Sequence, residues 1–155
     1  MKIDFTKPEY RLLLDLLEMA EWVMNAHSAW EEGETRHYAA LIQKIHAHAE
    51  EMGCGDIIEY SKELGGYFAT GAYEEQGNHR QFIEAFEEDL FWDELSYKLA
   101  VRDLAQQEGE EALEKMEFVE RATKLTEFLS WYEEEFSDND LANVRVVRER
   151  SNTVN

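Results

Sequence analysis

Apolar residues recur every three or four positions over most of the chain, a spacing that gathers them on one face of an α-helix. The segment 67–77 differs, because its aromatic residues follow no clear period, and it is predicted to be an ordered loop held by those side chains. The pattern predicts an all-α fold, a single-domain bundle of about five or six helices. The expected helices cover residues 7–28, 35–52, 56–64, 78–87, 90–107 and 110–136.

The first helix has clear start signals in the sequence. Thr6 is a suitable N-cap, Pro8 lies in the first turn where no amide donor is needed, and Glu9 completes a capping box with Thr6. Asp15 and Glu18 fall on the polar side of this helix. The face expected to point inward consists of Leu13, Leu16, Leu17, Ala20, Val23 and Met24.

Two apolar stripes run along the helix expected over 90–107. One holds Phe91, Trp92, Leu95 and Leu99, and the other holds Tyr97, Val101 and Leu104. A helix that is apolar on two sides is predicted to be the central helix of the bundle, covered from two directions. Gly109 is expected to interrupt it, as Gly53 ends the helix over 35–52.

No internal domain boundary is visible in the sequence. It has one proline, no Gly/Ser-rich linker and no fixed-period repeat. A chain of 155 residues buries roughly 70% of the surface that its unfolded form exposes, enough for one self-sufficient core. We therefore expect an acidic helical domain over 1–143 and a basic tail over 144–155 that is frayed or loosely docked.

The formal net charge is −20, with 35 acidic and 15 basic residues. The tail carries three arginines against Glu149, a net +2, so residues 1–143 carry −22. Such a body repels phosphate, and we expect neither direct nucleic-acid binding nor binding to an anionic membrane. Much of the glutamate suits solvated helix faces, where pairs such as Glu120 and Lys124 add a few tenths of a kcal/mol each.

The sequence contains no run of about 18 apolar residues and no signal-peptide core, which makes a cytoplasmic location the expectation. Cys54 stands alone, so it can form neither an internal disulfide nor a CxxC metal knuckle. Glycine-rich phosphate loops and the Gly-x-Ser-x-Gly elbow are absent. We accordingly expect no catalytic residues, no bound cofactor and no metal.

Glu34 and His37 form the only Glu-x-x-His pair in the chain. Carboxylate-bridged di-iron bundles need two such pairs, and a second is missing. The other histidines are expected to be surface or core-edge residues, since His46 and His48 project about 200° apart on a helix. A metal-dependent helical enzyme built on Glu34 and His37 is kept as an alternative.

Aromatic residues bordered by acids are typical of a surface that binds a basic partner. The favoured interpretation is a non-enzymatic acidic interaction protein that binds a basic protein partner, as a DNA mimic or a regulatory or immunity-like protein would. A self-associating structural protein, and hence a homo-oligomer, is the other alternative. The candidate interaction residues are Trp22, Glu87, Glu88, Asp89, Trp131, Glu133, Glu134 and Glu135.

Overall fold

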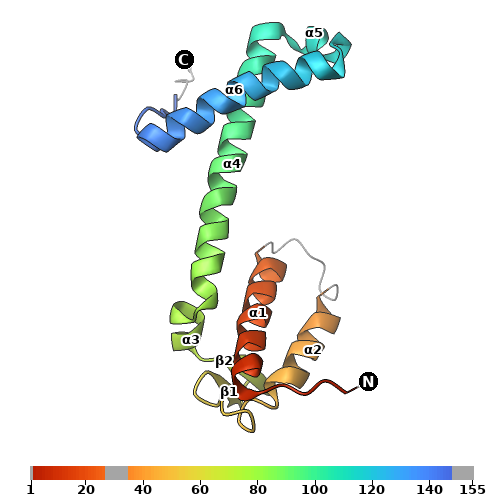
Figure 1. Ribbon diagram of the computed structural model, residues 1–155, viewed down its shortest axis with the longest axis vertical. Coiled ribbons are helices and arrows are strands. Elements are labelled where there is room, and N and C mark those ends of the chain that lie inside the picture. The colour runs from red at the N-terminus through yellow and green to blue at the C-terminus, as the bar shows by residue number, and fades with distance from the viewer. Residues whose placement is uncertain (1, 27–34, 148–155) are drawn as a thin grey trace, which may run out of the picture. The chain divides into compact units, whose positions relative to one another are not determined.

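The computed structural model describes residues 2–26 and 35–147, and within them the chain forms six helices and one short hairpin (Figure 1). This mostly helical architecture confirms the predicted fold class. No described helix is both long enough and apolar enough to cross a bilayer. The elements are α1 (Lys7–Asn25), α2 (Arg36–His46), β1 (Ile58–Ser61), β2 (Gly66–Ala69), α3 (Gly71–Gln76), α4 (His79–Glu108), α5 (Glu110–Lys115) and α6 (Phe118–Asn139).

The chain divides into two compact units, Met1–Glu87 and Glu88–Asn155, and the division falls within α4. We call them unit 1 and unit 2 and describe each by itself. The sequence-based division into 1–143 and 144–155 is a different one, and it stays a prediction. Of the expected tail, the structure describes only 144–147, and the end of the expected first helix, at 27–28, also lies outside the described residues.

Unit 1 contains an antiparallel hairpin that the sequence interpretation missed. β1 pairs with β2 in a register that sets Ile58 opposite Ala69 and Tyr60 opposite Tyr67. The predicted helix over 56–64 and the predicted loop over 67–77 are therefore wrong, the latter being β2 followed by α3. β-branched and aromatic residues favour strands, and Gly65, at φ +69°, supplies the left-handed conformation at the turn.

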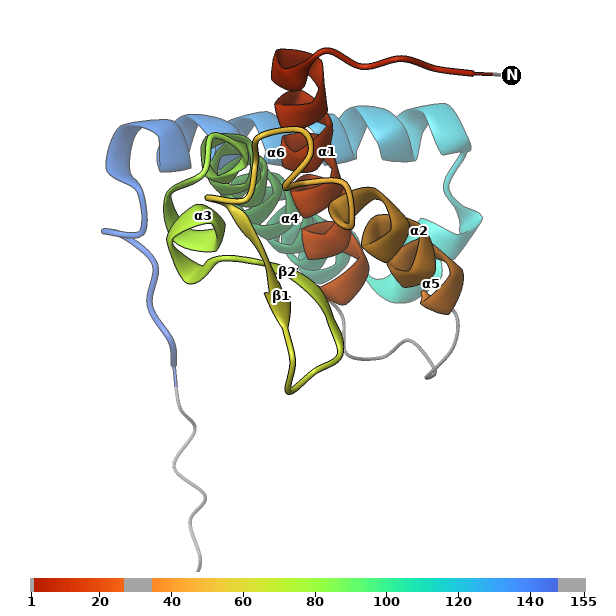
Figure 2. The same ribbon diagram turned by 90° about the horizontal axis from the view of Figure 1, so that it is seen from below.

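α2 contacts the hairpin, whose two strands lie side by side in Figure 2, and Gln43 of α2 holds it in place. Its Nε2 donates to the Tyr67 carbonyl at 2.6 Å, and its Oε1 accepts from the Tyr67 amide at 2.7 Å. A Cβ at Gly66 would come within 2.9 Å of that Oε1, so glycine permits the close approach. The hairpin and α2 are thereby fixed to one another.

The buried face of α1 differs from the predicted one. Leu14 is fully buried, with Tyr10 and Asp15 beside it, whereas Leu16 and Val23 are about 60% exposed. Tyr10 is buried because its hydroxyl donates to the Ile45 carbonyl at 2.6 Å and so joins α1 to α2. The core of unit 1 consists of Tyr10, Leu14, Ala49, Cys54, Ile57, Ile58 and Tyr73.

α2 ends at His46, six residues before the predicted end. The chain continues through tight turns, in which the Ala49 amide donates to the His46 carbonyl at 2.9 Å and the Cys54 amide to the Ala49 carbonyl at 2.8 Å. These turns bring Ala49 and Cys54 into the core, which a straight helix through Gly53 would not do.

α4 is one continuous helix, so the corner predicted at Glu87-Glu88-Asp89 is wrong. Exposed acidic side chains do not interrupt a helix when no glycine or proline accompanies them. Gly109, at φ +82°, ends the helix as predicted. The single helix predicted over 110–136 is in fact two helices, because Met116 adopts an extended conformation between α5 and α6.

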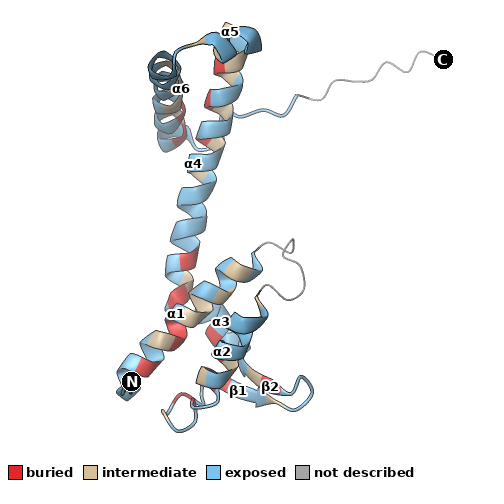
Figure 3. Ribbon diagram, turned by 90° about the vertical axis from the view of Figure 1, so that its right-hand side faces the viewer, coloured by how far each residue is buried: buried red, intermediate tan, exposed pale blue. Residues whose placement is uncertain are grey.

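Unit 2 is built on the pairing of α4 with α6, and Figure 3 shows the buried residues along their facing sides. Ala100 and Leu104 of α4 are buried, as are Tyr132 and Phe136 of α6. The predicted stripe that contains Leu104 is otherwise exposed at Tyr97 and Val101. Trp92, Leu95, Leu99, Leu125, Phe128 and Leu129 pack against this core half-buried.

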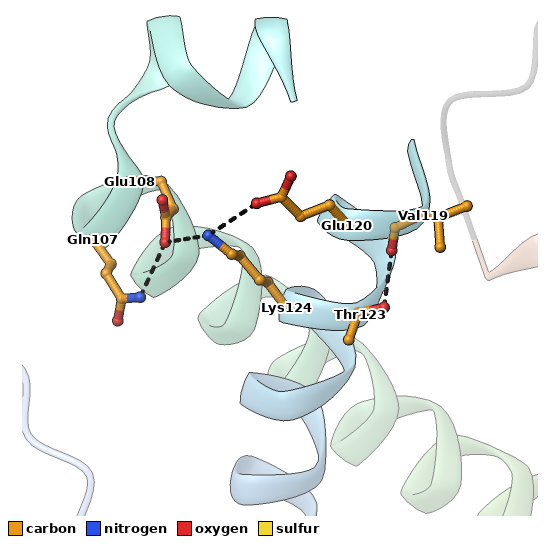
Figure 4. Close-up of polar contacts among 6 residues, drawn as sticks. All are labelled: Gln107, Glu108, Val119, Glu120, Thr123 and Lys124. Carbon is orange, nitrogen blue, oxygen red and sulfur yellow. Dashed lines mark hydrogen bonds and ion pairs between the residues drawn. The ribbon is translucent and has the colours of Figure 1, made fainter. Parts of the chain in front are cut away.

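Polar contacts join α6 to the end of α4 (Figure 4). Lys124 Nζ lies 3.0 Å from Glu108 Oε1 and 3.4 Å from Glu120 Oε1, so the predicted pairing of Glu120 with Lys124 is confirmed. A second polar contact joins the two helices, because the Tyr132 hydroxyl of α6 donates to Asp103 of α4. The other carboxylate oxygen of Asp103 accepts from Arg102 Nε at 2.6 Å.

The capping box at the start of α1 is present, and it gives a first testable prediction. The Glu9 amide donates to Thr6 Oγ1 at 3.4 Å, and the Thr6 amide donates to Glu9 Oε2 at 2.8 Å. Thr6→Ala is expected to lower the free energy of unfolding by about 1 kcal/mol, measured by urea unfolding. Thr6→Ser keeps the hydroxyl and serves as the control. Equal losses in both variants would show that the hydroxyl does not stabilise α1.

Candidate functional site

Unit 1 contains a cavity of about 560 Å³ that opens to solvent, and its volume is within the usual range of small-molecule sites. Its walls come from α1, α2, β2, α3 and the first turns of α4, so every segment of unit 1 except β1 contributes. Trp22, Phe68, Ile42 and Ile83 supply apolar surface. The charged and titratable residues of the lining are Glu18, Glu21, His46, Glu74, His79 and Arg80.

Three carboxylates face this cavity, Glu18 and Glu21 from α1 and Glu74 from α3. Burial is the main cause that raises the pKa of Glu18 to about 7, and the negative charges of Glu21, Glu74 and Asp15 contribute to the same shift. Burial, with the charge of Glu74, also raises the pKa of Glu21. Glu18 and Glu21 thus hold their protons more tightly than exposed carboxylates, because burial disfavours the charged form and neighbouring acids add repulsion.

His46 has one buried ring nitrogen, Nε2, without a hydrogen-bond partner among the described residues. The residue is 2% exposed, and its Nδ1 lies 3.5 Å from the Tyr67 carbonyl oxygen. A carbonyl oxygen only accepts, so this contact favours the tautomer that carries its proton on Nδ1. Burial lowers the pKa of His46 and keeps the ring neutral at pH 7. In that tautomer Nε2 is a buried acceptor, and no group of residues 2–26 and 35–147 donates a hydrogen bond to it.

His79 lies across the cavity from α2 in a separate polar group. Its Nδ1 is 3.7 Å from Asp15 Oδ1, too long for a hydrogen bond, and the same oxygen accepts from the Tyr73 hydroxyl at 2.6 Å. The rings of Tyr73 and His79 are edge to face at 4.8 Å. A Cβ at Gly77 would come within 2.4 Å of the His79 ring, so glycine is required there.

Three side chains of the cavity lining, Trp22, Gln43 and Arg80, donate hydrogen bonds to other groups of unit 1. Trp22 Nε1 donates to Glu87 Oε1 at 2.9 Å, and Gln43 Nε2 donates to the Tyr67 carbonyl. Arg80 donates to Glu84 at 3.4 Å, and its guanidinium lies 4.7 Å from the centre of the Trp22 ring. These donor atoms are therefore engaged within unit 1, whereas the carboxylates of Glu18, Glu21 and Glu74 present acceptors to the cavity.

Three buried side-chain atoms lack a hydrogen-bond partner within the described residues, and all three belong to residues of this cavity. They are Glu18 Oε1, His46 Nε2 and His79 Nδ1. An unsatisfied buried polar atom costs about 1–3 kcal/mol. A smaller cavity of about 290 Å³ in unit 2, lined by Trp92, Phe136 and acids, contains none of them. The cavity of unit 1 is therefore the candidate site.

The structure brings together one pair of the predicted interaction residues, Trp22 and Glu87, through the hydrogen bond at the cavity's edge. Glu88 and Asp89 follow on α4 and are exposed. On α6, Trp131 is 56% exposed and packs edge to face on Tyr132. Glu133 and Glu134 beside it are exposed, and Glu135 accepts from Asn143 at 2.6 Å.

The alternative metal pair is only half visible. Glu34 lies outside the described residues, and His37 is exposed at the start of α2. Across residues 2–26 and 35–147, no group of three His, Cys, Asp or Glu side chains is arranged to hold a metal ion. The expectation for His46 as a surface or core-edge residue is corrected, because the turn after α2 buries it.

Sequence reasoning missed Glu18, His46 and His79 as site residues. They come from three helices and form no local motif. No family model, curated protein or solved structure matches the chain. The candidate site is therefore defined by its own geometry and charge.

Proposed function

We propose that the chain is a non-enzymatic binding protein for a basic protein partner, and that the acidic cavity of unit 1 receives a cationic group of that partner. One observation carries the proposal: three carboxylates, Glu18, Glu21 and Glu74, line the same cavity, and the one arginine or lysine of its described lining, Arg80, is held by Glu84. A cationic group would compensate that charge and would partner the unsatisfied acceptors.

The composition of the lining favours binding over covalent catalysis. Among the described residues, the lining includes no serine, threonine, cysteine or lysine, the side chains that act most often as activated nucleophiles. Arg80 is the one arginine of the lining, and it is held by Glu84 and the Trp22 ring. The apolar surface of Ile42, Ile83 and Phe68 suits the aliphatic stem of a basic side chain.

The test is the affinity for a labelled peptide rich in lysine and arginine, compared with a peptide of the same length in which glutamine replaces them. The basic peptide is expected to bind and the glutamine peptide not to. The double variant Glu21→Gln/Glu74→Gln is expected to weaken binding by about tenfold, because it removes two carboxylates that face the ligand. Fluorescence anisotropy at 0.15 M salt measures both affinities.

The matched control is Glu110→Gln/Glu111→Gln, which removes the same charge from exposed positions on α5 that line neither cavity. A general attraction between a polyanion and a polycation would weaken equally in the two double variants. That outcome, or failure of the basic peptide to bind, would overturn the proposal. A loss confined to the cavity variant supports it.

A further inference from the structure

The unpartnered atoms of the cavity indicate which cation fits it. We infer that the cavity of unit 1 is a guanidinium site, in which Glu18 and Nε2 of His46 accept hydrogen bonds from an arginine side chain of the partner or from a free small guanidinium compound. This inference rests on the proposed function and adds the chemical group that the cavity selects.

The first reason is the number and placement of the acceptors. Glu18 Oε1 belongs to α1 and His46 Nε2 to α2, so the two atoms come from different walls of the cavity. A guanidinium carries five N–H donors spread around a planar fork, whereas an ammonium group carries three donors on one compact centre. The planar group can donate to several walls at once, and one of its edges matches a carboxylate in bidentate fashion.

The second reason is the mixture of carboxylates and aromatic surface. A guanidinium is more weakly hydrated than an ammonium and stacks on aromatic rings, so it loses less on entering a partly apolar cavity. Unit 1 already contains one such arrangement, since the Arg80 guanidinium lies over the Trp22 ring at 4.7 Å. The exposed ring of Phe68, on β2, offers a second aromatic surface in the same lining.

The third reason is the state of His46. The 3.5 Å contact of Nδ1 with the Tyr67 carbonyl favours a proton on Nδ1 and leaves Nε2 as the acceptor. Burial lowers the pKa of His46, which favours the neutral ring and so avoids a positive charge that would repel a cation. His79 is not proposed as a ligand of the guanidinium, because its unpartnered Nδ1 lies 3.7 Å from Asp15 Oδ1 and so points toward that carboxylate. At about 560 Å³ the cavity holds a guanidinium together with an aliphatic stem.

The experiment compares three capped amino acids by isothermal titration calorimetry: N-acetyl-arginine amide, N-acetyl-lysine amide and N-acetyl-citrulline amide. Citrulline has the shape of arginine without its charge. Arginine is expected to bind at least about tenfold more tightly than lysine, with no measurable citrulline binding. Glu18→Gln and His46→Gln are each expected to reduce arginine affinity by about tenfold, with both variants confirmed as folded by circular dichroism.

Two further probes separate the sources of the group. Tighter binding of an arginine-containing peptide than of N-ethylguanidinium assigns the site to a partner's side chain, and the reverse order assigns it to a free small compound. Equal affinity for the arginine and lysine probes overturns the guanidinium inference. If Glu21→Gln/Glu74→Gln still weakens binding of the basic peptide, the proposed function is left standing. Absence of binding to every basic probe overturns both.

Discussion

Replacing Leu14 with alanine is expected to lower the free energy of unfolding by about 3 kcal/mol, the largest single effect among the core positions of unit 1. Leu14 is fully buried among Tyr10, Ile58 and Tyr73, which come from separate elements of the unit. Truncation removes apolar surface from the core and leaves a space that these neighbours only partly refill. Urea unfolding followed by far-ultraviolet circular dichroism measures the loss.

Leu12→Ala is the matched control for this variant. Leu12 lies on the same helix but is 62% exposed, so the same truncation is expected to change stability by less than about 0.5 kcal/mol. The two leucines also separate the observed face of α1 from the one expected from periodicity. A larger effect at Leu12 than at Leu14 would contradict the buried face described here.

Glu18→Gln is expected to stabilise the protein at pH 8 and to leave its stability unchanged at pH 4. The carboxyl has a pKa of about 7 in the folded chain against 4.5 as the ordinary value. Below pH 4.5 both states hold the proton, and between 4.5 and 7 the unfolded chain releases it while the folded chain keeps it. The wild-type free energy of unfolding therefore falls over this window relative to the variant, whose amide does not titrate.

The expected gain at pH 8 is about 1 kcal/mol, or about 2–4 °C in melting temperature, because solvent partly screens this half-buried group. The groups that face it are the acids Asp15, Glu21 and Glu74 and, across the cavity, His46, His79 and Arg80. Differential scanning calorimetry at pH 4, 6 and 8 measures the effect. Glu63→Gln, at an exposed turn position, is the control; an identical pH trend there would refute the assignment to Glu18.

The helical class and the start of α1 could be predicted because they depend on local chemistry. Thr6, Pro8 and Glu9 specify a capping box wherever they precede an amphipathic segment. The hairpin could not be predicted in this way, since short apolar runs such as Ile57-Ile58 and Tyr67-Phe68 suit a strand or a short helix equally. Pairing between β1 and β2, together with Gln43 of α2, decides between them.

The face of α1 was mispredicted for a related reason. Leucine occupies positions 12, 13, 14, 16 and 17, so apolar residues lie on most sides of the helix and periodicity selects no unique face. Burial of Asp15 decides the orientation, because its carboxylate accepts from the Tyr73 hydroxyl of α3. That contact joins residues 58 positions apart, and no local pattern encodes it.

The candidate site was less predictable than the fold. The excess of acidic residues did favour a cationic partner, and one predicted interaction residue, Trp22, lines the cavity and donates to Glu87. Glu18 looked like one solvated glutamate among many, and His46 like a surface histidine. What distinguishes them is the loss of solvent and of hydrogen-bond partners, which depends on how α1, α2 and β2 pack together.

The side chain of Gln43 has a consequence for how this protein avoids unwanted assembly. The outward-facing amide and carbonyl of Tyr67 on β2 are the groups to which a strand from another molecule would add. Gln43 occupies both, so a single side chain imitates a neighbouring strand at that position. A two-stranded hairpin is normally a template for aggregation along its edges. Here α2 closes one of those edges at its centre and leaves the surface of β2 free for the cavity.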